Sequence, residues 1–171
     1  EFLDGNFDRE GREVTTVSSD NHMVLNSISV EALDSIKPAT IMHEESRQNG
    51  VFCVPKHFPG HGDTHQDSHH ELATVEHSLE QLQSVDLLPY QTLIDNHLLD
   101  ALMVGHIAVP ALDSTGTPSS ISKPIITDLL KNKLGYKGIV ITDALNMKGV
   151  CDHLEKKMIA LEAYKAGVDI L

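Results

Sequence analysis

The sequence has few cysteines, few basic residues and no long apolar run. Its 2 cysteines, Cys53 and Cys151, fit no metal-binding or redox spacing. Only 13 residues are Lys or Arg against 25 that are Asp or Glu, and the formal net charge is -12. This charge argues against a nucleic-acid partner, because phosphates need a cationic surface. No apolar run approaches the roughly 20 residues of a membrane helix, so we expect no membrane span.

The first residues leave the location of the protein undecided. Residues 1–12 are polar and acidic, and they show no signal-peptide pattern. The chain also begins without methionine, so its natural start can lie upstream.

Four short apolar runs predict β-strands, at residues 51–55, 101–104, 138–142 and 167–171. Each run is apolar on both faces, which is typical of a parallel strand that is covered on both sides.

Helical signals fill the intervals between these runs. Ser122 as an N-cap and Gly135 as a stop bound one predicted helix with periodic apolar residues. Residues 158–166 predict another helix. Pro89 and Pro38 are each expected to interrupt a helical stretch, because proline lacks a backbone N–H.

Strands that alternate with helices predict βαβ units and an α/β fold with a parallel sheet. A complete (β/α)₈ TIM barrel takes about 250 residues. Four units in 171 residues therefore look like half of such a barrel. An open doubly wound sheet is the competing architecture, because periodicity does not distinguish the two.

The segment richest in reactive side chains is residues 56–70, KHFPGHGDTHQDSHH, directly after the first predicted strand. Its proline and glycines favour a loop, and in an α/β barrel such a loop stands at the C-terminal face, where active sites lie. Its histidines recur every four residues, but that spacing makes a metal-binding stripe only on a helix. We expect no metal, with a zinc site as an alternative. His61, His65 and His70 are expected only to hydrogen-bond the loop.

Asp67 and His69 form the candidate acid/base pair in this loop. In an extended stretch, side chains two residues apart share one face. A carboxylate beside an imidazole orients the ring and favours its charged form, which makes the histidine a usable proton donor near neutral pH. An ion pair that only braces the loop explains the pattern equally well.

Further candidates stand at predicted strand ends. Asp143 follows the run 138–142, where a barrel would make it catalytic and where it could otherwise cap the next helix. His106 either lines the pocket or satisfies backbone groups. Lys56 is either a donor to a bound hydroxyl group or an exposed charge. Asp169 is expected to be structural.

Two long segments, KHFPGHGDTHQDSHHEL and GIVITDALNMKGV, resemble signature segments of glycoside hydrolase family 3, and of its bacterial β-N-acetylglucosaminidase branch in particular. Three further segments resemble the same branch and occur in the same order: LMVGHIAVPALD, ISKPIITDLLKNKLGYKG and KAGVDIL. The resemblance covers residues 50–171 well and residues 1–49 poorly. It implies that residues 1–171 are part of a catalytic (β/α)₈ barrel whose N-terminal half is absent.

The resemblance also implies an activity, the retaining hydrolysis of terminal β-linked N-acetylglucosamine, including muropeptides of peptidoglycan turnover, without a cofactor. Asp143 would be the nucleophile, His69 the proton donor and later base, and Asp67 its assistant. Lys56 and His57 would bind the sugar.

One departure and three alternatives accompany this interpretation. Thr15 stands where the family has a sugar-binding arginine. The open edges of half a barrel invite self-association. A phosphorylase is one alternative, because a histidine acid/base tolerates an incoming phosphate anion better than a carboxylate does. An inactive fragment that serves as a sugar-binding or assembly module is another, and a zinc hydrolase that uses the histidine loop is the third.

Overall fold

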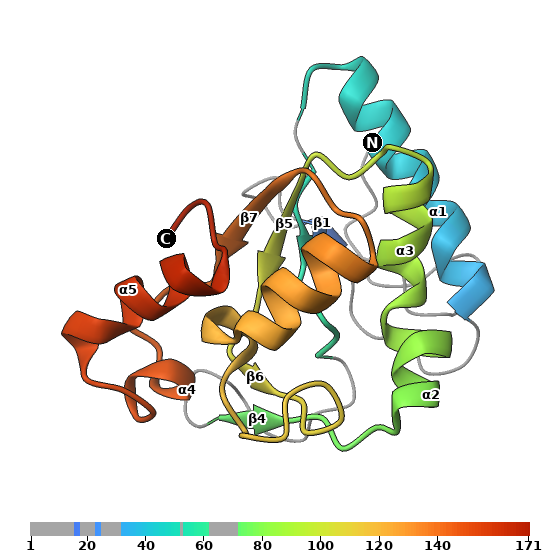
Figure 1. Ribbon diagram of the computed structural model, residues 1–171. Helices are drawn as coiled ribbons and strands as arrows, with labels where there is room; N and C mark the ends of the chain where they lie inside the picture. Colours follow the sequence, from blue (N-terminus) through green and yellow to red (C-terminus); the bar gives the residue numbers. More distant parts are fainter. Residues whose placement is uncertain (1–15, 18–22, 25–31, 52, 62–71) are drawn as a thin grey trace.

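A computed structural model describes residues 16–17, 23–24, 32–51, 53–61 and 72–171 of the chain. Its central strands β5 (Ala101–Val104) and β7 (Ile139–Thr142) pair in parallel over their whole length. Figure 1 shows helices flanking this pair, with α1 and α3 beyond the edge formed by β5 and α5 beyond the edge formed by β7. The described part is therefore an α/β structure, as the sequence predicts.

The other strands are short. β2 (Met23–Val24) pairs in parallel with β3 (Pro55–Lys56) and antiparallel with β1 (Thr16–Val17). β4 (Ala73–Thr74) pairs in parallel with β6 (Ile107–Ala108). The described strands form sheets of three, two and two strands and close no barrel.

Two of the four predicted strands are placed as expected, and two are corrected. The runs 101–104 and 138–142 become β5 and β7. In the run 51–55, strand pairing begins only at Pro55, where β2 supplies a partner. In the run 167–171, one bridge joins Ile170 to Ile141 of β7. An apolar run predicts burial, but strand length depends on which partner lies alongside.

The helices follow their sequence signals with one exception. The π-helix η3 (Pro124–Lys133) and α5 (Lys156–Ala166) occupy the two predicted segments, and Gly167 ends α5 with a φ of 108°. Pro89 lies in the first turn of α3 (Leu88–Asp95). The expectation for Pro38 is wrong, because α1 (Ala32–Gln48) runs straight through it.

Packing explains why α1 stays continuous. α1 lies against α3 and the π-helix η1 (Leu82–Asp86). Proline removes one backbone donor, and packing of a helix face outweighs such a local cost. The remaining helices are short; they are α2 (Leu79–Gln81), the 3₁₀-helix η2 (Ser119–Ile121) and α4 (Lys148–Cys151).

The hydrophobic core lies between the β5–β7 pair and its helices. Leu102, Val104 and Val140 project from the strands and are completely buried. Ile125 and Leu130 of η3 are also completely buried. The opposite strand face is more open, since Met103 and Ile141 are half-buried and Ile139 is 40% exposed.

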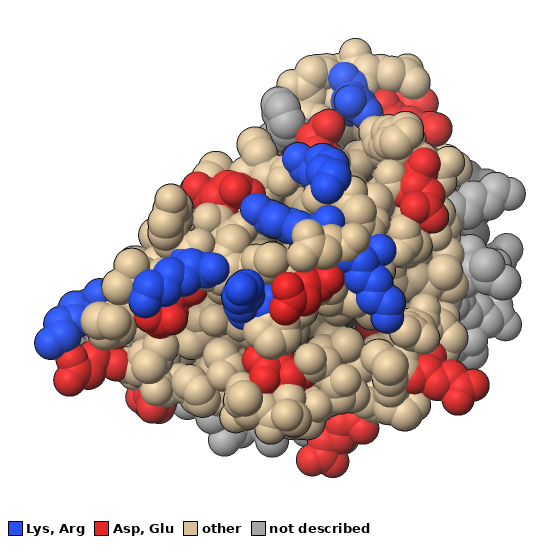
Figure 2. Space-filling view, in the orientation of Figure 1, with Lys and Arg blue, Asp and Glu red and all other residues tan. Residues whose placement is uncertain are grey.

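The surface in Figure 2 mixes basic and acidic side chains rather than separating them. Three ion pairs illustrate the mixing: Lys131–Asp169, Lys165–Glu162 and Arg47–Asp100. This face therefore offers no broad basic patch of the kind that nucleic acid needs. Among the described residues, no helix combines the length and apolar character that a membrane crossing requires.

Candidate active site

Backbone hydrogen bonds bring three chain segments together at the carboxyl ends of parallel strands. The amide of Phe58, just past β3, donates to the Met103 carbonyl at 2.9 Å, and the amide of Gly105 donates to the Phe58 carbonyl at 3.1 Å. The amide of Asp143 donates to the Val104 carbonyl at 3.0 Å. The side chains of His57, His106 and Asp143 therefore leave the sheet at the same edge.

His57 and Asp143 are in direct contact. His57 Nε2 lies 3.2 Å from Asp143 Oδ2, and the two side chains are 20% and 22% exposed. The second carboxylate oxygen, Oδ1, accepts the amide N–H of Ala144 at 2.7 Å. The hydrogen bond from His57 is the largest cause that holds the pKa of Asp143 well below its ordinary value, against the opposing effect of burial. Asp143 is therefore ionised and still reachable from solvent, as a nucleophile must be.

A glycine makes room for this contact. A Cβ atom on Gly105 would stand 2.9 Å from His57 Cβ and 3.0 Å from Ile107 Cδ1. Real Cβ atoms are not found so close to such neighbours, so a larger residue at 105 would displace the His57 backbone and its ring. Nothing in the sequence pattern singled out Gly105, because its importance comes from a neighbour distant in sequence.

His106 is placed differently from the other two. Its ring is 1% exposed, and both nitrogens have partners: Nδ1 lies 2.7 Å from Ser120 Oγ, and Nε2 lies 3.0 Å from the Ala144 carbonyl oxygen. Burial is the main cause that lowers the pKa of His106. Of the two expectations for His106, this geometry matches the contact with backbone groups and leaves no ring nitrogen for a ligand.

Three buried serines, which sequence reasoning did not single out, fix the segment that follows β5. The Ser119 hydroxyl donates to the Ile107 carbonyl at 2.6 Å, and the Ser122 hydroxyl donates to Asp113 Oδ2 at 2.6 Å. Ser120 contacts His106. The sequence carries little signal for them, because the run SSIS follows the polar stretch DSTGTP; once buried, each hydroxyl needs an internal partner.

The remaining predicted residues are divided between described and undescribed parts of the chain. Lys56 ends β3 and is half-buried, and the peptide bond between Lys56 and His57 is cis. The ring of His61 packs edge-on against His57, with centroids 5.7 Å apart. Asp67 and His69 lie outside the described residues, as do His65, His70 and Thr15.

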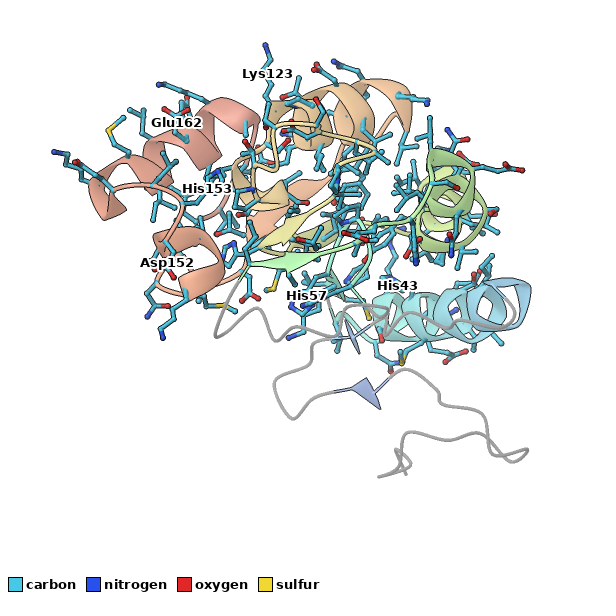
Figure 3. The ribbon with its side chains drawn as sticks, turned by 90° about the horizontal axis from the view of Figure 1, so that it is seen from below. His43, His57, Lys123, Asp152, His153 and Glu162 are labelled. Carbon is cyan, nitrogen blue, oxygen red and sulfur yellow. The ribbon has the colours of Figure 1, made fainter. Side chains whose placement is uncertain are left out.

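In the part of the chain that the structure describes, no three His, Cys, Asp or Glu side chains converge, so these residues offer no zinc site. A separate hollow of about 390 Å³ lies near the connection between α4 and α5. Lys123, His153 and Glu162 line it, and Figure 3 shows these side chains gathered away from His57. It contains none of the predicted site residues.

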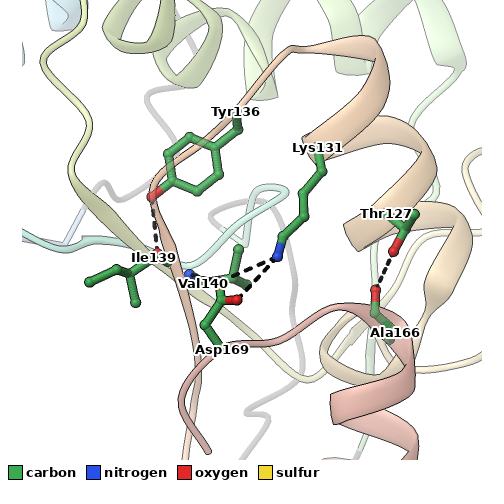
Figure 4. Close-up of polar contacts among 7 residues, drawn as sticks. All are labelled: Thr127, Lys131, Tyr136, Ile139, Val140, Ala166 and Asp169. Carbon is green, nitrogen blue, oxygen red and sulfur yellow. Dashed lines mark hydrogen bonds and ion pairs between the residues drawn. The ribbon is translucent and has the colours of Figure 1, made fainter.

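A second aspartate, Asp169, follows α5 and lies beside the beginning of β7. Asp169 Oδ2 accepts the amide N–H of Val140 at 2.8 Å, and Lys131 Nζ lies 3.3 Å from both carboxylate oxygens. The Tyr136 hydroxyl donates to the Ile139 carbonyl nearby (Figure 4). All these partners belong to the scaffold, which agrees with the structural role expected of Asp169.

Comparison with known proteins adds a family. Residues 5–171 match the model of the glycosyl hydrolase family 3 N terminal domain. The chain is 40% identical to beta-hexosaminidase A of Pseudoalteromonas piscicida over 131 residues, which are 71% of this chain and 22% of that protein.

Two solved structures are similar to the described fold. One is a family 3 beta-N-acetylglucosaminidase from Paenibacillus sp. str. FPU-7, with 37% identity, a TM-score of 0.76, and coverage of 80% of this chain and 26% of that one. The other is the beta-glucoside phosphorylase BglX, with 25% identity, a TM-score of 0.78, and coverage of 82% and 27%. This chain thus spans about a quarter of each of these relatives.

Proposed function

Since the chain belongs to glycoside hydrolase family 3, we propose that it contributes the nucleophile of a retaining enzyme that removes terminal β-linked N-acetylglucosamine. The observation that carries the proposal is the ionised Asp143 at the carboxyl end of β7, in contact with His57. The names of two relatives, a beta-hexosaminidase and a beta-N-acetylglucosaminidase, support the choice of sugar. Muropeptides of peptidoglycan turnover are the substrates that we favour.

The proposed reaction has two steps. The Asp143 carboxylate attacks the anomeric carbon, and the bond to the leaving oxygen breaks as His69 donates a proton to that oxygen. His69 then takes a proton from water, whose oxygen attacks the same carbon and releases Asp143. Asp67 orients His69, and Lys56 and His57 hold the sugar. The reaction needs no cofactor.

We further propose that residues 1–171 form the C-terminal half of a (β/α)₈ barrel, part of the catalytic domain of the family. The open strand face with Met103, Ile139 and Ile141 is consistent with this arrangement, because the interior of a complete barrel is packed with side chains. An uncovered face and open sheet edges favour self-association of the isolated chain.

The test is hydrolysis of an aryl β-N-acetylglucosaminide by the purified chain and two variants. Asp143→Asn removes the nucleophile, and we expect turnover to fall by about 10³-fold or more. Asp128→Asn is the matched control, because Asp128 is an exposed residue of η3, and its turnover should stay unchanged. Full activity of Asp143→Asn would contradict the assignment. An inactive wild-type chain would contradict a self-sufficient half-barrel.

A phosphorylase is the second candidate, favoured by the likeness to BglX. Adding inorganic phosphate to the same assay separates the two reactions. A hydrolase releases free N-acetylglucosamine at a rate that phosphate leaves unchanged, whereas a phosphorylase forms the sugar 1-phosphate.

A further inference from the structure

A buried histidine holds the backbone turn that follows the candidate nucleophile. His106 Nε2 lies 3.0 Å from the carbonyl oxygen of Ala144. The amide nitrogen of the same residue, Ala144, donates to Asp143 Oδ1 at 2.7 Å. One residue thus connects the imidazole to the carboxylate, with His106 on its carbonyl and Asp143 on its amide.

The partners of His106 determine its tautomer. A carbonyl oxygen can only accept a hydrogen bond, so Nε2 must carry the proton. In a neutral ring the other nitrogen, Nδ1, then has no proton and must accept. The Ser120 hydroxyl, 2.7 Å away and completely buried, is able to donate to it. The polar atoms of His106 and Ser120 are then both satisfied without water.

The chain positions Ser120 for this task. Ser120 belongs to η2, whose three residues are all buried. Its neighbour Ser119 bonds the Ile107 carbonyl, one residue after His106. Ser119 and Ser120 therefore attach η2 to two adjacent residues, Ile107 and His106, which leaves the His106 ring little freedom to rotate.

We propose that His106 is a positioning residue for Asp143: a neutral imidazole, kept in the Nε2–H tautomer by Ser120, that holds the Ala144 carbonyl and so orients the Asp143 carboxylate. Its kinetic consequence rests on the proposed function, because that function makes Asp143 the nucleophile. The proton on Nε2 follows from the geometry alone, because its partner is a carbonyl oxygen, and the burial of the ring favours the neutral form.

The first arm of the test needs no activity. Ring-nitrogen NMR of the ¹⁵N-labelled chain at pH 7 identifies which nitrogen of each histidine carries a proton, and His106→Gln assigns the His106 signals by their loss. We expect a neutral Nε2–H ring, and we expect Ser120→Ala to allow the other tautomer to appear. A protonated ring, or a predominant Nδ1–H tautomer in the wild type, would overturn the proposal.

The second arm compares two neutral amides in the aryl-glycoside assay. His106→Gln can place an amide N–H near the position of Nε2 and keep the bond to Ala144, whereas His106→Asn reaches only as far as Nδ1. Loss of that buried bond should lower kcat about 10- to 100-fold in His106→Asn, with KM changed less than about twofold. His106→Gln should keep kcat within about fivefold of the wild type.

Thermal unfolding of both variants separates positioning from stability. Equal losses of kcat in the two variants would contradict the proposal, as would a raised KM at unchanged kcat, which would indicate a sugar contact. If the wild-type chain turns nothing over, the isolated half-barrel is not self-sufficient, and the ring-nitrogen spectra alone decide the hydrogen-bond assignment.

Discussion

Asp143 and Asp169 sit at opposite ends of β7, and both carboxylates accept a backbone N–H, yet their surroundings differ. Asp143 follows the strand, contacts His57, and has a side chain that is 22% exposed. Asp169 bonds the Val140 amide near the beginning of the strand and pairs with Lys131. One aspartate faces titratable groups at the carboxyl edge, and the other connects a helix to a strand.

The difference shows what turns a capping aspartate into a candidate nucleophile. Both aspartates accept a hydrogen bond from a backbone N–H, so this bond does not account for the difference between them. Asp143 gains a hydrogen bond from His57, and the effect of this bond on the pKa of Asp143 outweighs the cost of burying its charge. The carboxyl ends of parallel strands are where such groups from distant parts of the chain meet.

Two glycine variants should give the largest difference between the two ends of β7, one in activity and the other in stability. Gly105→Ala places a Cβ 2.9 Å from His57 Cβ, and Gly138→Ala places one 2.4 Å from the Asp100 carbonyl oxygen. We expect Gly105→Ala to lower activity about 10- to 100-fold by moving His57 away from Asp143. Gly138→Ala should instead lower the free energy of unfolding by about 1–3 kcal/mol.

Urea unfolding and aryl-glycoside kinetics on both variants make the measurement. Each rate is expressed per folded molecule. If Gly138→Ala lost as much activity per folded molecule as Gly105→Ala, the division of the molecule into a reactive end and a structural end would be wrong.

The stability of the protein should also depend on pH through His43, a buried residue outside the candidate site. His43 of α1 is 3% exposed, and its Nε2 finds no hydrogen-bond partner among the described residues. Burial lowers its pKa from the ordinary 6.5 to about 4. Below pH 6.5 the unfolded chain therefore binds a proton that the folded chain does not.

Stability should consequently fall as the pH drops from 6.5 to about 4, by about 3 kcal/mol in total from this one group. His43→Leu should flatten that part of the stability profile, measured by urea unfolding at several pH values. Asp143 should contribute its own loss only at lower pH, because the stability that its lowered pKa provides is lost below the ordinary value of 3.8. An unchanged pH profile in His43→Leu would show that another group is responsible.

Local signals were sufficient for some elements. The apolar runs of β5 and β7, the N-cap region at Ser122 and the stop at Gly167 depend on residues close in sequence, and their positions were predicted. The placement of Asp143 after a buried strand was predicted in the same way.

Other features depend on neighbours that the sequence does not identify. The strand at β3 starts where β2 lies alongside, and α1 crosses Pro38 because it packs against α3. His106 was predicted only as one of two alternatives, because its partners, Ser120 and Ala144, lie 14 and 38 residues away. The contact between Gly105 and His57 was missed for the same reason.

Trapping the covalent intermediate tests the central claim most directly. An N-acetylglucosaminyl fluoride with an additional fluorine at C5 slows both steps of a retaining reaction, so the glycosyl-enzyme accumulates and can be digested and sequenced by mass spectrometry. We predict a single sugar on the peptide that contains Asp143, attached to that carboxylate. A sugar attached to any other residue would contradict the assignment of Asp143 as the nucleophile.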